Sequence, residues 1–390
     1  MRLNSYDDWS PLREIVVGSA ENYLSHERDM SFDLFFYDQL ADDENNFDKM
    51  YYPSVRRRTA EGDAPEDDAP ARGRHRIKQR YVDELVEDVE GLAEVLRQLS
   101  VTVLRPQTMR ADQRIRTLAW EADAIPPLNI RDNALVLGDE IIETPPQVRA
   151  RYHENQFLAE IFGDYFDDGA RWTVMPRPLM TDRSFDRSYA AGSPGGPAEY
   201  IDDPRPSAYD VGLEMMFDGA QCLRLGGDIM VNIATANHEL AVRWLERHLA
   251  GRFRIHRVHN LADNHIDSKV IALRPGLLLV RNQAVADMLP PQLQKWDMIM
   301  APPPDANNFP AYDDGELILT SKYIDMNVLS VSPDTVLVNE ACPELIKTLE
   351  AARFTVVPVR HRHRRLFGGG FHCFTLDTVR EGSEPEFYLD

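Results

Sequence analysis

The stretch Val270–Val280, VIALRPGLLLV, holds a Pro-Gly dipeptide between two short apolar runs and therefore predicts a β-hairpin. A helical stretch near 285–296 and a third strand, Met298–Ala301, follow it along the chain. A second hairpin of the same design is expected at 327–338. These patterns indicate a unit in which two strands are followed by a helix and a further strand.

The helix and the last strand of this unit recur about five times along the chain. Helical stretches are expected near 82–99, 148–162, 240–249, 285–296 and 343–352. Each is followed by an expected strand, and these strands lie, in the same order, near 101–106, 172–176, 253–258, 298–302 and 354–359. This repetition favours an α/β fold built as a five-unit propeller around a central channel over a doubly wound sheet. An ordinary α/β domain whose elements are alike by chance is the alternative.

We expect a single domain over 1–390 that is interrupted by three irregular segments. They lie near 54–75, 181–212 and 301–315 and are rich in proline, glycine or charged residues. The first resembles an exposed linker. The second and third are candidates for the rim of an active site, because long loops inside compact domains often carry function.

The composition excludes several classes of protein. Hydrophobic residues make up 43% and charged residues 27%, as in globular enzymes, and no apolar run approaches a membrane span. The N-terminal residues lack the apolar core of a signal peptide, so we expect a cytoplasmic protein. A net charge of -21 argues against a nucleic-acid partner. The 3 cysteines, Cys222, Cys342 and Cys373, are too few and too scattered for a disulfide framework.

The most informative cysteine is Cys373, which ends the run Gly368–Cys373, GGGFHC. Glycines allow a backbone to approach a substrate closely or to adopt positive φ, so the run is suited to presenting a nucleophilic thiol. A buried thiol after a glycine-rich turn is the structural alternative.

Three further polar clusters stand where one unit of the repeat gives way to the next. They are 129–132 (NIRD), 216–220 (MFDGA) and 264–267 (NHID). In a radial fold such positions meet at the mouth of the channel. A cysteine nucleophile needs a base that is oriented by a carboxylate, and Cys373, His265 and Asp218 supply these three roles.

Carboxylates in these clusters indicate the charge of the substrate. His265 and Asp267 are two residues apart, so an extended segment points both side chains to one face, and Asp132 adds a second carboxylate. Acidic groups facing a thiolate suit a planar cation such as a guanidinium. A metal site would use the same residue types, but their spacing matches no closed zinc pattern, so we expect neither a metal nor a cofactor.

These residues stand in motifs that resemble those of the amidinotransferases, the family of glycine amidinotransferase and the inosamine-phosphate amidinotransferases. The resemblance runs from 5–12 through 138–145 to 386–390, and its motifs are FDGA at 217–220, HID at 265–267, TSK at 320–322 with Met326-Asn327, and GGGFHC at 368–373. It implies a pentein-like propeller of five units. It also implies transfer of an amidino group from L-arginine or a related guanidine to an acceptor amine, as in specialised-metabolite biosynthesis, by a homodimer.

The resemblance also implies roles for individual residues in a ping-pong reaction. They are Cys373 as nucleophile, His265 as general acid and base, Asp218 as its orienting partner, Asp132 and Asp267 as clamps on the guanidinium, and Ser321 near the amino-acid end of the donor.

This chain departs from the family's motifs at the donor's carboxylate. Where the family usually has Asn-Pro-x-Arg, residues 281–284 read Arg-Asn-Gln-Ala, so Ala284 stands in place of the carboxylate-binding arginine. Arg281 could replace it from a shifted position, or the donor is another guanidine. Gln221 replaces an acidic residue, and 226–228 read Gly-Gly-Asp instead of Gly-Arg-Asp. The rival functions are a guanidine hydrolase of the deiminase type and a binding protein that has lost catalysis.

Overall fold

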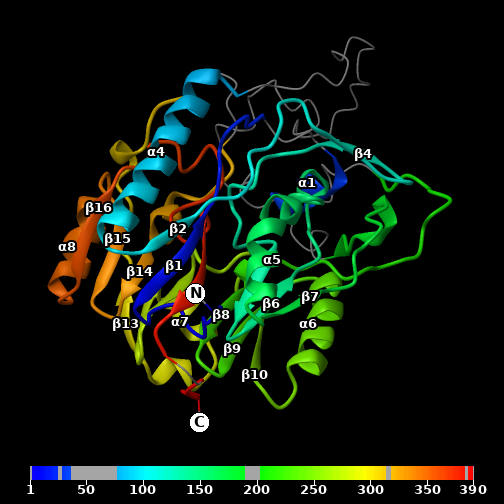
Figure 1. Cartoon of the computed structure of the whole chain (residues 1–390). Helices are drawn as coiled ribbons and strands as arrows, with labels where there is room; N and C mark the ends of the chain where they lie inside the picture. The colour runs from blue at the N-terminus through cyan, green and yellow to red at the C-terminus, as the bar shows by residue number, and fades with distance from the viewer. Residues whose placement is uncertain are drawn as a thin grey trace, which may run out of the picture.

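The computed structural model describes residues 2–24, 29–36, 77–188, 203–312, 318–382 and 385–389. Helices and strands alternate along these residues, so the predicted α/β class is confirmed (Figure 1). The irregular segment expected near 54–75 lies outside the described residues, as do 189–202 of the second segment and 313–315 of the third. None of the helices in the described ranges combines the length and apolar character that a membrane crossing requires.

Five three-stranded sheets in the described residues share one pairing pattern. Two consist of β5 (Ala134–Leu137), β6 (Glu140–Glu143) and β7 (Arg171–Val174), and of β8 (Cys222–Leu225), β9 (Asp228–Ile233) and β10 (Arg254–His259). Two more consist of β11 (Val270–Arg274), β12 (Leu277–Val280) and β13 (Asp297–Met300), and of β14 (Leu329–Ser332), β15 (Thr335–Asn339) and β16 (Thr355–Val359). The fifth joins β17 (Thr375–Arg380) to β1 (Leu12–Val17) and β2 (Thr102–Leu104). In every sheet the middle strand pairs antiparallel with one neighbour and parallel with the other.

In each sheet, a helix precedes the strand that pairs parallel with the middle strand, because parallel strands need a crossover connection. These helices are α4 (Gln79–Gln98), α5 (Ala159–Asp167), α6 (Ala236–Leu249), α7 (Gln283–Met288) and α8 (Pro343–Ala351). Figure 1 shows α4 and α8 on the left of the molecule, α6 on the right and α5 between them. The predicted order of strand, strand, helix and strand is therefore confirmed in the unit that begins at β11.

Two predicted helices have different bounds in the structure. The helix expected at 148–162 begins only at Ala159, and the residues before it form short 3-10 turns. Arg151 and Glu154 in these turns point inward and form a buried ion pair, which explains their departure from a surface helix. The helix expected at 285–296 ends at Met288, because Pro290 and Pro291 cannot continue it.

Two elements lie outside the repeat. A two-stranded sheet pairs β3 (Arg114–Arg116) with β4 (Glu121–Asp123), which the sequence did not predict. The short helix α1 (Met30–Phe35) begins at Asp29, whose carboxylate accepts a hydrogen bond from the backbone N–H of Phe32.

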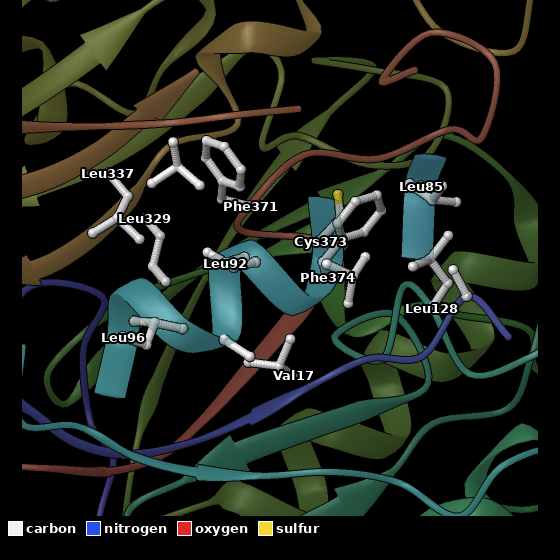
Figure 2. Close-up of a cluster of buried hydrophobic side chains, with 14 of the residues drawn as sticks. Val17, Leu85, Leu92, Leu96, Leu128, Leu329, Leu337, Phe371, Cys373 and Phe374 are labelled. Carbon is white, nitrogen blue, oxygen red and sulfur yellow. The ribbon is translucent and has the colours of Figure 1, made fainter. Parts of the chain in front are cut away.

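The helix α4 packs its apolar face against the segment that carries Cys373. Buried side chains of α4 recur at helical spacing, among them Leu85, Leu92 and Leu96. They form one cluster with Phe371 and Cys373, as Figure 2 shows. The backbone around the cysteine is therefore held by apolar packing.

Beneath this cluster, buried charges tie several sheets together. Arg224 on β8 donates hydrogen bonds to both Asp8 and Asp377, and Asp377 lies on β17. The guanidinium of Arg131, which precedes β5, also donates a hydrogen bond to Asp377 at 2.7 Å. Each of these buried charges has an opposite charge beside it, as burial requires.

Candidate active site

The residues of the candidate site occupy equivalent places in the five sheets. Asp132 precedes β5, Asp218 precedes β8, Asp267 precedes β11, Asn327 precedes β14 and Cys373 precedes β17. Each of these strands pairs antiparallel with the middle strand of its sheet. The repeat therefore delivers one polar side chain from every sheet to the site.

A cavity of about 970 Å³, measured with its open mouth, collects most of the sequence-predicted site residues. Its lining includes Cys373, His265, Asp132, Asp267, Ser321 and Arg281. Asp218 is buried and not among the lining residues, but it contacts His265 from behind.

The thiol of Cys373 is held between two side chains. Its Sγ donates a hydrogen bond to Oδ2 of Asp267 at 3.2 Å and accepts one from Nδ2 of Asn327 at 3.2 Å. The Oδ1 atom of Asn327 also accepts from the backbone N–H of Cys373 at 2.9 Å. Burial, and then the charges of Asp267 and Asp132, raise the pKa of Cys373 well above its ordinary value. The thiol therefore stays protonated until a positive charge enters beside it.

Glycines before Cys373 allow this segment to pack tightly. Gly368 has φ of +74°, a conformation that glycine adopts without strain. A Cβ on Gly370 would lie 2.6 Å from the Cβ of Asn327, the residue that holds the thiol. Glycine is therefore required here both by backbone conformation and by the close approach of Asn327.

His265 and Asp218 form a hydrogen-bonded pair. The Nε2 atom of His265 donates to Oδ2 of Asp218 at 2.8 Å, and Asp218 is itself fixed in a capping box with Gln221. Burial alone lowers the pKa of His265, but Asp132 and Asp218 outweigh it and raise this pKa to about 9. His265 is therefore an imidazolium at neutral pH. Within the described residues, no hydrogen bond joins His265 directly to Cys373.

Asp132 keeps one carboxylate oxygen for a ligand. Its Oδ2 pairs with Arg151, which also pairs with Glu154. Its Oδ1 is buried and has no hydrogen-bond partner in the described part of the chain. Burial raises the pKa of Asp132 against the opposing charges of His265 and Arg151. A guanidinium N–H is the kind of donor that would satisfy this oxygen.

Asp267 is shared between the thiol and a second imidazole. The Nδ1 atom of His372 lies 3.0 Å from the same Oδ2 that accepts from Cys373. Burial acts to raise the pKa of Asp267, but the hydrogen bond and charge of His372 outweigh it and lower this pKa to about 2. Asp267 is therefore a carboxylate at every pH at which an enzyme would work.

Arg281 brings positive charge to another part of the cavity wall. Its guanidinium lies 3.4 Å from Oγ of Ser321 and 4.3 Å from the centre of the Tyr323 ring. Its backbone N–H donates to the carbonyl of Lys269, which also lines the cavity. This wall is suited to the carboxylate of an amino acid.

Asp132, Asp218 and His265 also form a group with the spacing of metal ligands, since one atom from each lies within 4.8 Å of the others. Both carboxylates already face a positive group, Arg151 or His265. A metal ion here would add positive charge beside the protonated imidazole. We therefore keep the prediction that Asp132 acts on a guanidinium and that Asp218 orients His265.

Sequence reasoning assigned no role to Asn327, Arg151 or His372, all of which contact a predicted site residue. Asn327 could have been found from its position, because it precedes a strand as the other site residues do. The segments 181–212 and 301–315 were expected at the rim. Their described residues do not line the catalytic cavity, where Phe35 and Phe36 at the end of α1 lie instead.

No family model matches the chain. It is 32% identical over 380 residues to inosamine-phosphate amidinotransferase 1 of Streptomyces glaucescens, covering 97% of both chains. It is 29% identical over 394 residues to the mitochondrial glycine amidinotransferase of Gallus gallus, covering 98% of this chain and 84% of that one.

Solved structures give a similar result. The inosamine-phosphate amidinotransferase of Streptomyces griseus superposes with a TM-score of 0.79 at 29% identity, covering 100% of this chain and 99% of that one. The N-terminal domain of a cyanobacterial arginine dihydrolase superposes with a TM-score of 0.50 at 14% identity, covering 95% of this chain and 99% of that one. The second likeness concerns the fold alone.

Proposed function

Since this chain belongs to the amidinotransferase family, we propose that it transfers an amidino group from L-arginine to an acceptor amine through an amidino-cysteine on Cys373. One observation carries the proposal. The Cys373 thiol contacts Asp267 in a cavity that is also lined by Asp132 and by His265, which Asp218 contacts from behind. Nucleophile, cation clamps and a protonated acid thus line the same cavity.

In the first half-reaction, the guanidinium of the donor binds between Asp132 and Asp267. Its positive charge lowers the pKa of the Cys373 thiol, which releases its proton to solvent through the open mouth of the cavity, while Asp267 stays a carboxylate. The thiolate attacks the guanidino carbon and forms the C–S bond. His265 donates its proton to the departing nitrogen as the C–N bond breaks, and ornithine leaves.

In the second half-reaction, the neutral amine of the acceptor attacks the amidino carbon. His265, left neutral by the first step, removes a proton from the attacking nitrogen. The C–S bond breaks, the thiolate is restored and the new guanidine leaves. Asp218 holds the imidazole in orientation through both steps.

Arg281 and Ser321 are proposed to bind the carboxylate of the donor. The family's arginine at this function is replaced by Ala284, and Arg281 supplies a guanidinium on the same cavity. Its contact with Tyr323 restricts the side chain, which favours a fixed position. Arginine thereby remains the donor that best fits both ends of the cavity.

The test is intact-mass analysis after incubation with a panel of guanidines. L-arginine should leave one amidino group on the wild-type protein and none on Cys373→Ala. Ornithine release that depends on an added amine supports transfer, whereas citrulline formed without an amine would identify a hydrolase. A chain that binds arginine but forms no adduct would be a binding protein, and the family membership and the retained Cys373, His265 and Asp218 argue against it.

The architecture is proposed to follow the same family. The five sheets with one pairing pattern support a pentein-like propeller of a single domain, with the catalytic cavity at one end of its central channel. The pairing of β17 with β1 supports closure, because it joins the two ends of the chain in one unit. A homodimeric, cytoplasmic enzyme remains the prediction from the resemblance and the composition.

A further inference from the structure

A second cavity, of about 360 Å³ and here called the side cavity, adjoins the catalytic cavity. The two share Phe35, Asp263 and Asn264 in their linings. The lining of the side cavity mixes apolar side chains, such as Phe185 and Met216, with polar ones. Two of the polar residues are carboxylates, Asp263 and Asp186, and the described lining contains no lysine, arginine or histidine. Its charge therefore favours a cation.

The shared wall lies directly beside the proposed base. The ring of Phe35 packs edge-on against His265 with 5.2 Å between ring centres. Asn264 fixes this contact, because its Nδ2 donates to the Phe35 carbonyl and its Oδ1 accepts from the His265 backbone N–H. A molecule whose amine reaches His265 can thus extend along Phe35 into the side cavity.

The two carboxylates of the side cavity differ in their contacts. Asp186 accepts hydrogen bonds from the backbone N–H groups of Ala236 and Ser188, so its charge is already satisfied. Asp263 is half-buried and makes no hydrogen bond or ion pair with any described residue. Asp132, in contrast, pairs with Arg151, and Asp267 contacts His372 and the Cys373 thiol. Asp263 is therefore the carboxylate that lacks a positive partner.

We propose that the acceptor is a diamine. This inference rests on the proposed function and names the substrate class of the same site. One amine attacks the amidino group beside His265, the hydrocarbon part packs against Phe35, and the second amine, as an ammonium, pairs with Asp263 at the entrance of the side cavity. A carboxylate or phosphate at that place would meet a like charge instead.

The experiment uses the full chain and separates the two half-reactions. The enzyme is first loaded with L-arginine, and adduct formation is followed by intact mass and ornithine release. The loaded enzyme then receives 1,4-diaminobutane, butylamine or 4-aminobutanoate, which share a carbon chain and differ in terminal charge. We expect kcat/KM for the diamine to exceed that for butylamine by about tenfold to hundredfold, the range of a charged hydrogen bond, with 4-aminobutanoate slowest.

The matched variants are Asp263→Asn and Asp297→Asn, the second at an exposed position at the start of β13. Asp263→Asn should lose most of the preference for the diamine while the arginine half-reaction keeps its rate, and Asp297→Asn should change neither. Calorimetry on Cys373→Ala should detect 1,4-diaminobutane without turnover and a weaker affinity in the double variant with Asp263→Asn.

Two results would overturn the inference. One is a kcat/KM for butylamine or 4-aminobutanoate that equals or exceeds that for the diamine. Such a result with 4-aminobutanoate would indicate that Arg281 binds a carboxylate of the acceptor. The other is an affinity for 1,4-diaminobutane that is the same in Cys373→Ala and in the double variant with Asp263→Asn, or no detectable binding in either variant. Neither resembles a failure of the proposed function, which would appear earlier as the lack of any amidino adduct.

Discussion

The thiol of Cys373 donates a hydrogen bond to the carboxylate of Asp267 across 3.2 Å. In the proposed reaction, this contact makes formation of the thiolate nucleophile depend on substrate binding. A carboxylate beside a thiol disfavours the thiolate, but the same carboxylate attracts the guanidinium whose charge reverses the effect. The site thus restrains the thiol until a cation of the correct shape is bound.

Alkylation of Cys373 should depend on the charge of the reagent. Because burial, Asp267 and Asp132 raise the pKa of this thiol, a neutral haloacetamide should react slowly at pH 7. A haloacetamidine of the same size should react at least about tenfold faster, since its charge lowers the thiol pKa by the equivalent of a unit or more. Inactivation kinetics with both reagents measure the ratio.

The control for this prediction is Asp267→Asn, which removes one carboxylate without changing the side chain's shape. The neutral reagent should then react faster and the cationic reagent should lose its advantage. Equal rates of the two reagents in the wild type would contradict substrate-dependent activation.

The basic limb of the pH profile should report His265. In the proposed reaction this residue must be protonated to release ornithine, and Asp132 and Asp218 outweigh burial to raise its pKa to about 9. The rate of adduct formation should therefore fall as pH rises through about 9. Asp218→Asn weakens the support for the imidazolium, so the limb should move to lower pH by about one unit or more.

Adduct formation in Asp218→Asn should also slow by about a hundredfold, because the imidazole loses its orientation. Stopped-flow ornithine release over pH 6–10, roughly the range in which an imidazole of raised pKa titrates, gives both quantities. A limb that does not move would assign it to a group other than His265.

The repeating unit could be predicted because its signals are local. Pro275-Gly276 between apolar runs marks a hairpin wherever it occurs, and β11 and β12 form as expected. The pairing of β17 with β1 had no such signal, because its partners are separated by most of the chain. The 3-10 turns at 149–158 were missed for a related reason: the ion pairs that stabilise them depend on Asp132, which comes from another loop.

In the site too, local signals could be predicted from the sequence and contacts between distant segments could not. His265 and Asp267 could be placed together because they are two residues apart, and Cys373 because glycines precede it. The contact of His372 with Asp267 was not predictable, because the glycines that indicate the position of Cys373 do not show which way the side chain of the adjacent His372 points. The position of Asp263 between two cavities likewise depends on α1, more than 220 residues earlier in the chain.

His372 should act as a positioning residue through Asp267. Its Nδ1 holds Oδ2 of Asp267 at 3.0 Å and contributes to the lowered pKa of that carboxylate. In His372→Ala this pKa should rise towards its ordinary value. The acid limb of kcat/KM for arginine should then move to higher pH, because a protonated Asp267 no longer attracts the guanidinium.

The conservative variant His372→Asn retains an N–H donor near the position of Nδ1. It should move the acid limb of kcat/KM part of the way back to its wild-type pH. If His372 had a purely structural role, no such return would be expected. An acid limb that is the same in His372→Ala and the wild type would exclude the proposed coupling.

The buried charges beneath the site should make stability depend on Arg224. This guanidinium donates to both Asp8 and Asp377. Burial acts to raise the pKa of each carboxyl, but Arg224 and the other positive groups beside them together hold it below its ordinary value. Arg224→Met leaves two buried carboxylates without this partner, so it should lose about 3–5 kcal/mol of unfolding free energy at pH 7. Groups with depressed pKa values stabilise the fold above the unfolded-state pKa of about 4 and lose that contribution as pH falls.

The difference between Arg224→Met and the wild type should therefore shrink below about pH 4, where the carboxylates of the variant become protonated. Urea unfolding at several pH values measures it. Arg171→Met is the matched control, because Arg171 also pairs with an aspartate, Asp139, but both side chains are exposed. Its cost should stay below about 1 kcal/mol. A similar cost for the two variants would mean that the buried cluster contributes no more to stability than an ion pair at the surface.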